Sequence, residues 1–101
     1  MTLKQLDYFL ALARVGGYKA AAKACGVAQS TLSLMIQRLE EDLGVTLFDR
    51  GCNPVRLTPI GLRLKTHART IARNANQMQA LARRAKEGHA SVASEECAST
   101  L

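Results

Sequence analysis

The segment Ala20–Gly44 constrains the fold most, because it predicts two short helices joined by a tight turn at Gly26. Apolar side chains recur in it at helical spacing and predict a buried face; they are Ala21, Ala22, Cys25, Val27, Leu32, Ile36, Leu39 and Leu43. The second helix is expected to leave mainly short hydroxyl and amide side chains outside, namely Gln29, Ser30, Thr31, Ser33, Leu34 and Gln37. Such a face can approach base edges closely. The segment therefore predicts a helix-turn-helix whose second helix enters the major groove of DNA.

The composition fits one small helical domain. The chain has 101 residues, 48% of them hydrophobic and only 4% aromatic, which suits a core of closely packed helices. The net charge of +6 is compatible with a polyanionic partner. No apolar run is long enough for a signal peptide or a membrane span, so we expect a cytoplasmic protein without a membrane partner. The three cysteines are odd in number and widely spaced, which favours a reduced compartment over a disulfide framework or a zinc site.

The flanking segments complete a mainly α fold, a winged helix-turn-helix. A first helix is expected from Thr2, which forms a capping box with Gln5, to the glycines Gly16 and Gly17. Two further helices are expected at about 18–25 and 29–43. Residues 45–48 and 55–57 contain strand formers and enclose the turn-rich residues 49–54, which predicts a small β-hairpin, the wing. We expect a DNA-binding domain at 1–58, a linker or dimerisation helix at 59–87, and a flexible tail or truncated hinge at 88–101.

A long helix is expected from Pro59 to about Glu87, with Thr58 as its N-cap. Its apolar residues alternate four and three apart, as in a heptad seam; they are Leu64, Ala68, Ile71, Ala75, Met78, Ala82 and Ala85. One small winged domain cannot cover so long a stripe. The seam therefore predicts a partner helix, most simply from a second copy of the chain, in a homodimer or a higher even-numbered oligomer.

The segments IQRLEEDLGVTLFDR, which begins at Ile36, and LTPIG, which begins at Leu57, carry a resemblance to a known family. The chain from about Leu3 to Ala85 resembles the N-terminal domain of LysR-type transcriptional regulators. This resemblance implies a winged helix-turn-helix with a long linker helix, dimerisation through that helix, and sequence-specific binding to double-stranded DNA of bacterial promoters. The family normally carries a C-terminal effector-sensing domain, so no small-molecule effector site is expected within these residues.

The resemblance also assigns roles to single residues. It implies that Gln29, Thr31 and Ser33 approach bases, and that Arg50 and Arg56 belong to the wing that meets DNA. Three positions depart from the residues usual in the family. Ala28 stands where a serine or threonine is usual, Ser30 where a proline is usual, and Leu34 where a polar or basic residue is usual.

The residues themselves leave alternatives open on the recognition helix. Gln29 can read adenine in a bidentate manner, or it is a polar residue at a helix N-terminus. The hydroxyls of Thr31 and Ser33, and the methyl of Thr31, can meet base edges, or they belong to a solvated face. Leu34 can pack on a thymine methyl group, or it is an exposed leucine that touches a neighbour. Ser30, with a hydroxyl that can cap the helix or bind phosphate, and Gln37 complete the expected DNA-binding face.

Four basic residues outside that helix are further candidates. Arg50 and Arg56 flank the wing and suit a narrow minor groove or a phosphate clamp. The alternative for Arg50 is an ion pair with a nearby acid such as Asp49 or Asp42. Lys19 and Lys23 are expected to contact phosphates, or they are solvated lysines on an exposed helix.

No residue pattern predicts catalysis. The chain shows no nucleophile–base pair, phosphate loop or paired-carboxylate motif, and His67 and His89 are far apart in sequence. We expect no enzyme activity, no catalytic residue, no metal and no cofactor. The alternative to a DNA-binding module is a small interaction protein that forms mixed dimers with a full-length regulator through its long helix.

Overall fold

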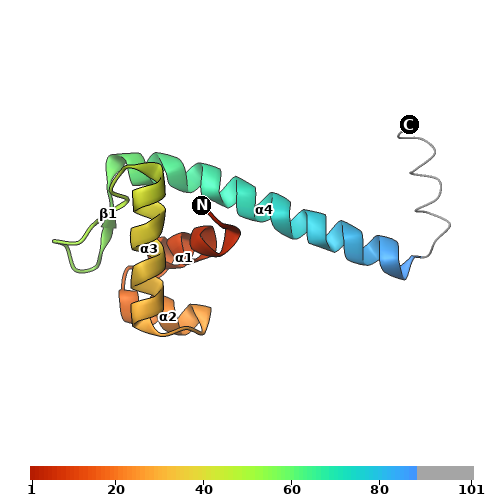
Figure 1. The fold of residues 1–101 in the computed structure, drawn as a ribbon, viewed down its shortest axis with the longest axis horizontal. Coiled ribbons are helices and arrows are strands. Elements are labelled where there is room, and N and C mark those ends of the chain that lie inside the picture. Colours follow the sequence, from red (N-terminus) through yellow and green to blue (C-terminus); the bar gives the residue numbers. More distant parts are fainter. Residues whose placement is uncertain (89–101) are drawn as a thin grey trace.

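The computed structural model describes residues 1–88. It contains the helices α1 (Leu3–Val15), α2 (Tyr18–Cys25), α3 (Gln29–Leu43) and α4 (Pro59–Glu87), and the strands β1 (Phe48–Asp49) and β2 (Arg56–Leu57). Figure 1 shows that α1, α2 and α3 form the body, that the β1–β2 wing extends from one side, and that α4 crosses the body and projects beyond it on the other side. The mainly α winged helix-turn-helix fold is confirmed. The tail expected at 88–101 lies outside the described residues from 89 onward.

The helix ends follow their predicted capping residues. Thr2 and Gln5 form the capping box, because the backbone N–H of each donates to the side-chain oxygen of the other at 3.0 and 3.1 Å. Gly16 ends α1 with φ 76°, and Gly26 ends α2 with φ 70°, in the left-handed region that glycine adopts without a Cβ clash. The α3 N-cap is Ala28, which offers no side-chain cap.

The core lies where the three helices of the body meet the base of the wing. Its largest fully buried side chains come from α1, α3 and the segment that enters β1, and they are Phe9, Leu12, Leu32, Ile36, Leu39, Leu47 and Phe48. The rings of Phe9 and Phe48 meet edge to face at 5.5 Å between centroids. Leu43 was predicted to be buried, which is wrong: it is 37% exposed, because it lies in the last turn of α3 at the rim of the core. Cys25 and Val27 are half-buried against the core.

The wing is shorter than predicted. Phe48 pairs with Leu57 and Asp49 pairs with Arg56 in an antiparallel register, so the first strand starts at Phe48 and includes Asp49, which was expected in the turn. Residues 45–47 were expected in this strand and lie outside it. The Leu47 N–H instead donates to the Glu40 carboxylate. The carbonyl of Leu47 accepts the backbone N–H of Thr58 at 2.9 Å, so this part of the chain is bonded to α3 and α4.

The helix α4 is joined to the body only along its first part. It contacts α1 and β2, and Gly61 and Ala68 are its buried residues. The Thr58 hydroxyl accepts the Gly61 N–H at 3.0 Å and donates to the carbonyl oxygen of Thr46 at 2.6 Å. Its N-cap therefore also bonds to the segment before β1. Within residues 1–88, no helix is long and apolar enough to cross a membrane.

Candidate nucleic-acid interface

The outward face of α3 is the first part of the candidate interface. Gln29, Ser30, Thr31, Leu34 and Gln37 are exposed as expected, and Ser33 is half-buried. No other element of the described chain covers these side chains. Apart from Leu34 the face is polar, and it is uncharged up to Gln37, whereas Glu41 and Asp42 follow in the last turns. The first half of α3 is therefore the half that an anionic ligand can approach.

A shallow groove connects this face to α2 and the wing. It is lined by Lys19, Lys23, Gln29 and Asn53, together with the backbone around Gly17. The structure thus brings together three predicted site residues from two helices. Asn53 was not among the predicted residues, although the turn-rich run Asp49–Pro54 placed it in the wing loop. Its amide can both donate and accept hydrogen bonds at this groove.

The two arginines of the wing have different surroundings. Arg56 is exposed on β2 and makes no ion pair within the described residues. Arg50 follows β1, and its Nε donates to the hydroxyl of Tyr18 at 2.8 Å. Its Nη2 also donates to Glu40 Oε1 at 2.9 Å. The structure therefore has the ion pair that was the alternative for Arg50, although with Glu40 rather than with Asp49 or Asp42.

The electrostatics of Arg50 agree with this arrangement. Partial burial on its own would lower the pKa of the guanidinium, but the hydrogen bond and charge of Glu40 and the nearby Tyr18 outweigh that effect and raise the pKa above its ordinary value. The arginine is therefore held charged in the wing. Its side chain is still 46% exposed, so solvent screens the ion pair and its contribution to stability is small.

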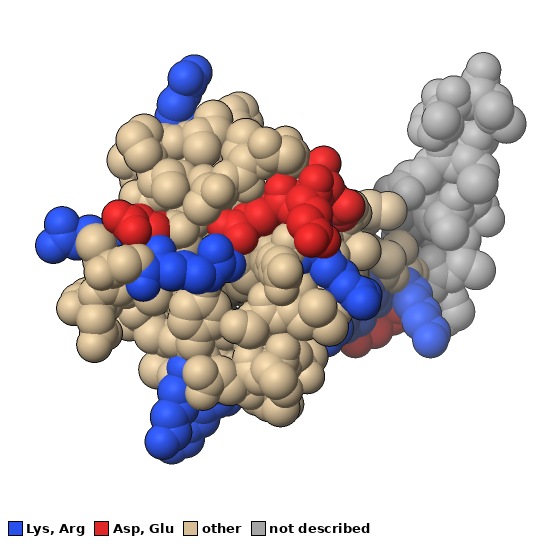
Figure 2. Space-filling model, turned by 60° about the vertical axis from the view of Figure 1, so that its left-hand side comes forward, with Lys and Arg blue, Asp and Glu red and all other residues tan. Residues whose placement is uncertain are grey.

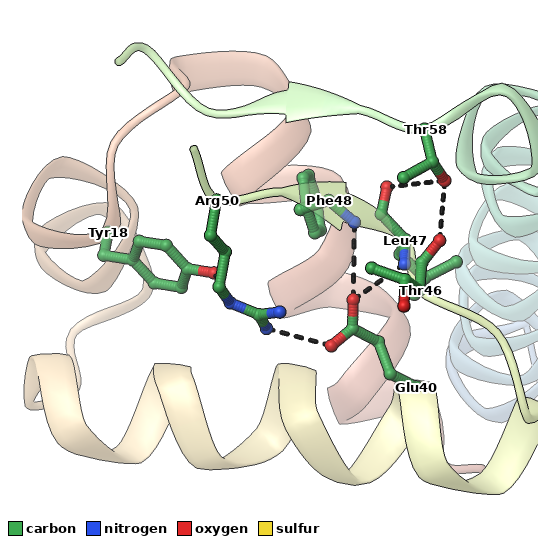
Figure 3. A network of polar contacts seen from close by, with 7 residues as sticks. All are labelled: Tyr18, Glu40, Thr46, Leu47, Phe48, Arg50 and Thr58. Atoms are coloured by element: carbon green, nitrogen blue, oxygen red, sulfur yellow. Dashed lines mark hydrogen bonds and ion pairs between the residues drawn. The ribbon is translucent and has the colours of Figure 1, made fainter. Parts of the chain in front are cut away.

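Glu40 is the centre of this network, and it was not among the predicted site residues. One oxygen of its carboxylate accepts the backbone N–H groups of Leu47 and Phe48, at 2.7 and 3.3 Å, while the other oxygen accepts from Arg50 (Figure 3). Leu47 and Phe48 are fully buried. Glu40 therefore joins α3 to the strand that starts the wing, and Arg50 and Tyr18 extend the connection to α2.

We expect Glu40→Ala to lower the free energy of unfolding by about 2 kcal/mol, because two backbone N–H groups at buried residues lose their acceptor. Glu40→Gln is the matched control. Its amide oxygen can still accept from the backbone, so we expect a loss below about 1 kcal/mol. Urea denaturation of both variants measures the difference. Equal losses would mean that the ion pair to Arg50, not the backbone bonds, is the stabilising contact.

The charges are unevenly distributed over the surface. On the face that Figure 2 shows, acidic side chains gather near the middle, while Lys and Arg side chains stand apart from one another around them. This face therefore carries no continuous basic patch. The exposed lysines of α2 and Arg56 are separate cationic points around the uncharged face of α3.

The predicted seam of α4 divides into two parts. Ala68 is buried, and Leu64 is half-buried against the protomer's own core, so both are at least partly covered within the chain. Farther along, Ile71, Met78 and Ala82 are exposed, and Ala75 and Ala85 are half-buried. Leu81 was missed by the heptad pattern and is 60% exposed. An apolar groove lies beside Ile71, and its walls are Leu6, Phe9, Leu39, Leu43 and Ala68.

Comparison with known proteins decides the family. The model of the bacterial regulatory helix-turn-helix proteins of the lysR family matches residues 3–62, more than half of the chain. The chain belongs to the LysR family. The matched range contains α1, α2, α3, the wing and the start of α4.

The LysR-family relatives are transcriptional regulators that are much longer than this chain. The chain is 38% identical over 82 residues to the DNA-binding transcriptional dual regulator OxyR of Escherichia coli, a match that covers 81% of this chain and 27% of OxyR. It is 41% identical over 85 residues to the HTH-type transcriptional regulator BenM of Acinetobacter baylyi, covering 83% of this chain and 28% of BenM. The chain thus spans less than a third of the length of these relatives.

Solved LysR-family structures support the same assignment. The BenM_DBD chain in its complex with catB site 1 DNA matches with a TM-score of 0.83 and 38% sequence identity, covering 88% of this chain and 96% of that chain. Nearly the whole DNA-bound BenM_DBD chain therefore has a counterpart here.

Among the described residues, no three His, Cys, Asp or Glu side chains lie close enough together to hold a metal ion.

Proposed function

We propose that this chain is the sequence-specific DNA-binding module of a bacterial LysR-type transcriptional regulator that acts in the cytoplasm. The observation that carries the proposal is the outward face of α3, which is largely exposed in the described residues and, apart from Leu34, polar. Side chains of this kind match the donor and acceptor pattern of base edges in the major groove. In support, the same fold occurs in a BenM_DBD chain that is in complex with DNA.

Each part of the interface has a proposed task. Gln29, Thr31, Ser33, Leu34 and Gln37 face the bases. The hydroxyl of Ser30 and the ammonium groups of Lys19 and Lys23 contact phosphates, which position α3 in the groove. Arg56 contacts the backbone or the minor groove from the wing. Arg50, which is bonded to Glu40 and Tyr18, contributes mainly by orienting the wing.

The proposed active form is a homodimer that pairs through α4. In support, α4 exposes large apolar side chains at Ile71, Met78 and Leu81. A second copy of the helix can cover them and fill the apolar groove beside Ile71. Burial of such side chains stabilises association by about 1.5–3 kcal/mol each before the cost of association is subtracted. Mass measurement of the free protein tests the dimer.

Selection of bound duplexes from a random DNA pool tests the function. The purified chain should enrich a sequence with two related half-sites, without any added partner protein. We expect Gln29→Ala to cost about 1–3 kcal/mol at one base pair per half-site and to relax the preference there, because a bidentate contact to adenine is lost. An equal loss on selected and random duplexes would show that Gln29 does not read a base.

The same experiment separates the module from the alternative, an interaction protein that acts through mixed dimers. Such a protein would need a full-length regulator before it met DNA. Gel shift of the purified chain alone therefore distinguishes the two, and absence of any shift even at low salt would refute the proposed function. The exposed α3 face favours the DNA-binding module, because mixed dimerisation through α4 makes no use of it.

A further inference from the structure

Leu34 occupies the most outward position in the middle of α3. The buried side of this helix is set by Leu32, Ile36 and Leu39. With about 100° per residue in an α-helix, Leu34 points within about 15° of the direction opposite that side. Its side chain is 42% exposed. The neighbours one helical turn away are all polar, and they are Ser30, Thr31, Gln37 and Arg38.

An apolar side chain at this position has one chemical match in the major groove. Thymine alone presents an apolar group there, its C5-methyl, whereas the other bases present hydrogen-bond donors and acceptors at their edges. A leucine pressed against those polar groups removes water from them without replacing the lost hydrogen bonds. We propose that Leu34 specifies a thymine in each half-site by packing on its C5-methyl group. This inference rests on the proposed function, because it requires α3 to enter the groove.

A protein partner fits Leu34 less well. Met78 and Leu81, two of the most exposed large apolar side chains, lie in the later part of α4, whereas Leu34 is on a separate helix of the body. The neighbours of Leu34 on α3 add no apolar area to it. A single leucine within a polar face suits a contact of methyl size better than a protein interface, whose core is largely apolar.

The test removes one methyl group from the DNA at a time. After the bound sequence has been selected from a random pool, each thymine in a half-site is replaced by deoxyuridine, which lacks only the C5-methyl. For the natural chain we expect affinity to fall about fourfold at one thymine per half-site, the fold-change for losing one buried methyl-sized group. Leu34→Ala should show no such loss at that position, because its side chain no longer reaches the methyl.

Thr31→Ser is the matched control, because Thr31 lies one turn from Leu34 and also carries a methyl that can meet thymine. Whatever its own affinity, this variant should keep the fourfold deoxyuridine effect. The thymine contact is overturned if no deoxyuridine weakens binding, if the effect persists in Leu34→Ala, or if it disappears in Thr31→Ser. If the chain selects a consensus sequence but one of these outcomes is observed, only the proposed Leu34–thymine contact is refuted. A chain that selects no DNA refutes the proposed function itself.

Discussion

Raising monovalent salt from about 50 mM to about 200 mM is expected to weaken the binding of selected duplex DNA about 2,000-fold. Lys19, Lys23 and Arg56 are the three proposed cationic phosphate contacts of each protomer. The proposed dimer therefore neutralises six phosphates. Each neutralised phosphate contributes about −0.9 to the slope of log K against log salt, so the slope should be about −5.4. Fluorescence anisotropy of a labelled duplex over this salt range measures it.

Charge-removing variants show whether the slope comes from these residues. Lys23→Gln removes one contact from each protomer and should make the slope less steep by about 1.8. Lys86→Gln is the matched control, because Lys86 is exposed near the far end of α4. It should leave the slope unchanged. A slope that is flat for the natural chain, or that changes equally in both variants, would contradict the proposed contacts of α2.

Replacing Gly61 with alanine is expected to lower the free energy of unfolding by about 3 kcal/mol, at the upper end of the range for overpacked sites. A Cβ atom on Gly61 would collide with the backbone carbonyl of Leu47, which is held in place by the backbone N–H of Thr58. Neither partner is a flexible side chain that can move aside. Either α4 must shift away from Leu47 or the bonds of Thr58 must break. Thermal or urea unfolding measures the loss.

Gly17→Ala is a suitable control for this variant. Gly17 is the N-cap of α2, has φ −139°, and would place its added Cβ in open space. We expect this substitution to change stability by less than about 1 kcal/mol. If Gly61→Ala were as stable as Gly17→Ala, the contact between the start of α4 and Leu47 would be looser than described.

Local signals in the sequence were sufficient to predict where the helices begin and end. The capping box of Thr2, the left-handed Gly16 and Gly26, and the Thr58–Pro59 start of α4 all involve residues within one turn of each other. Their effect on the backbone does not depend on the rest of the fold. The helix bounds could therefore be predicted from the sequence.

The wing could not be predicted as well, because its bonds join distant residues. Glu40 lies in α3, but its carboxylate accepts the N–H groups of Leu47, just before the first strand, and of Phe48, at its start. The alternative to DNA contact for Arg50 was an ion pair with Asp49 or Asp42, and the structure has Glu40 and Tyr18 as its partners instead. Neither Asn53 in the groove nor Leu81 on α4 followed from a periodic pattern, since loop shape and chain folding determine their exposure.

Thr58, the N-cap of α4, is bonded through its hydroxyl to the carbonyl oxygens of Thr46 and Leu47. The direction in which α4 leaves the body is therefore tied to the segment that precedes β1. In the proposed dimer, this joint sets the distance and rotation between the two α3 helices. Each base pair inserted between half-sites rotates one relative to the other by about 35° around the duplex. Operators changed by a few base pairs in their centre should accordingly bind one protomer at a time, even when both half-sites are intact.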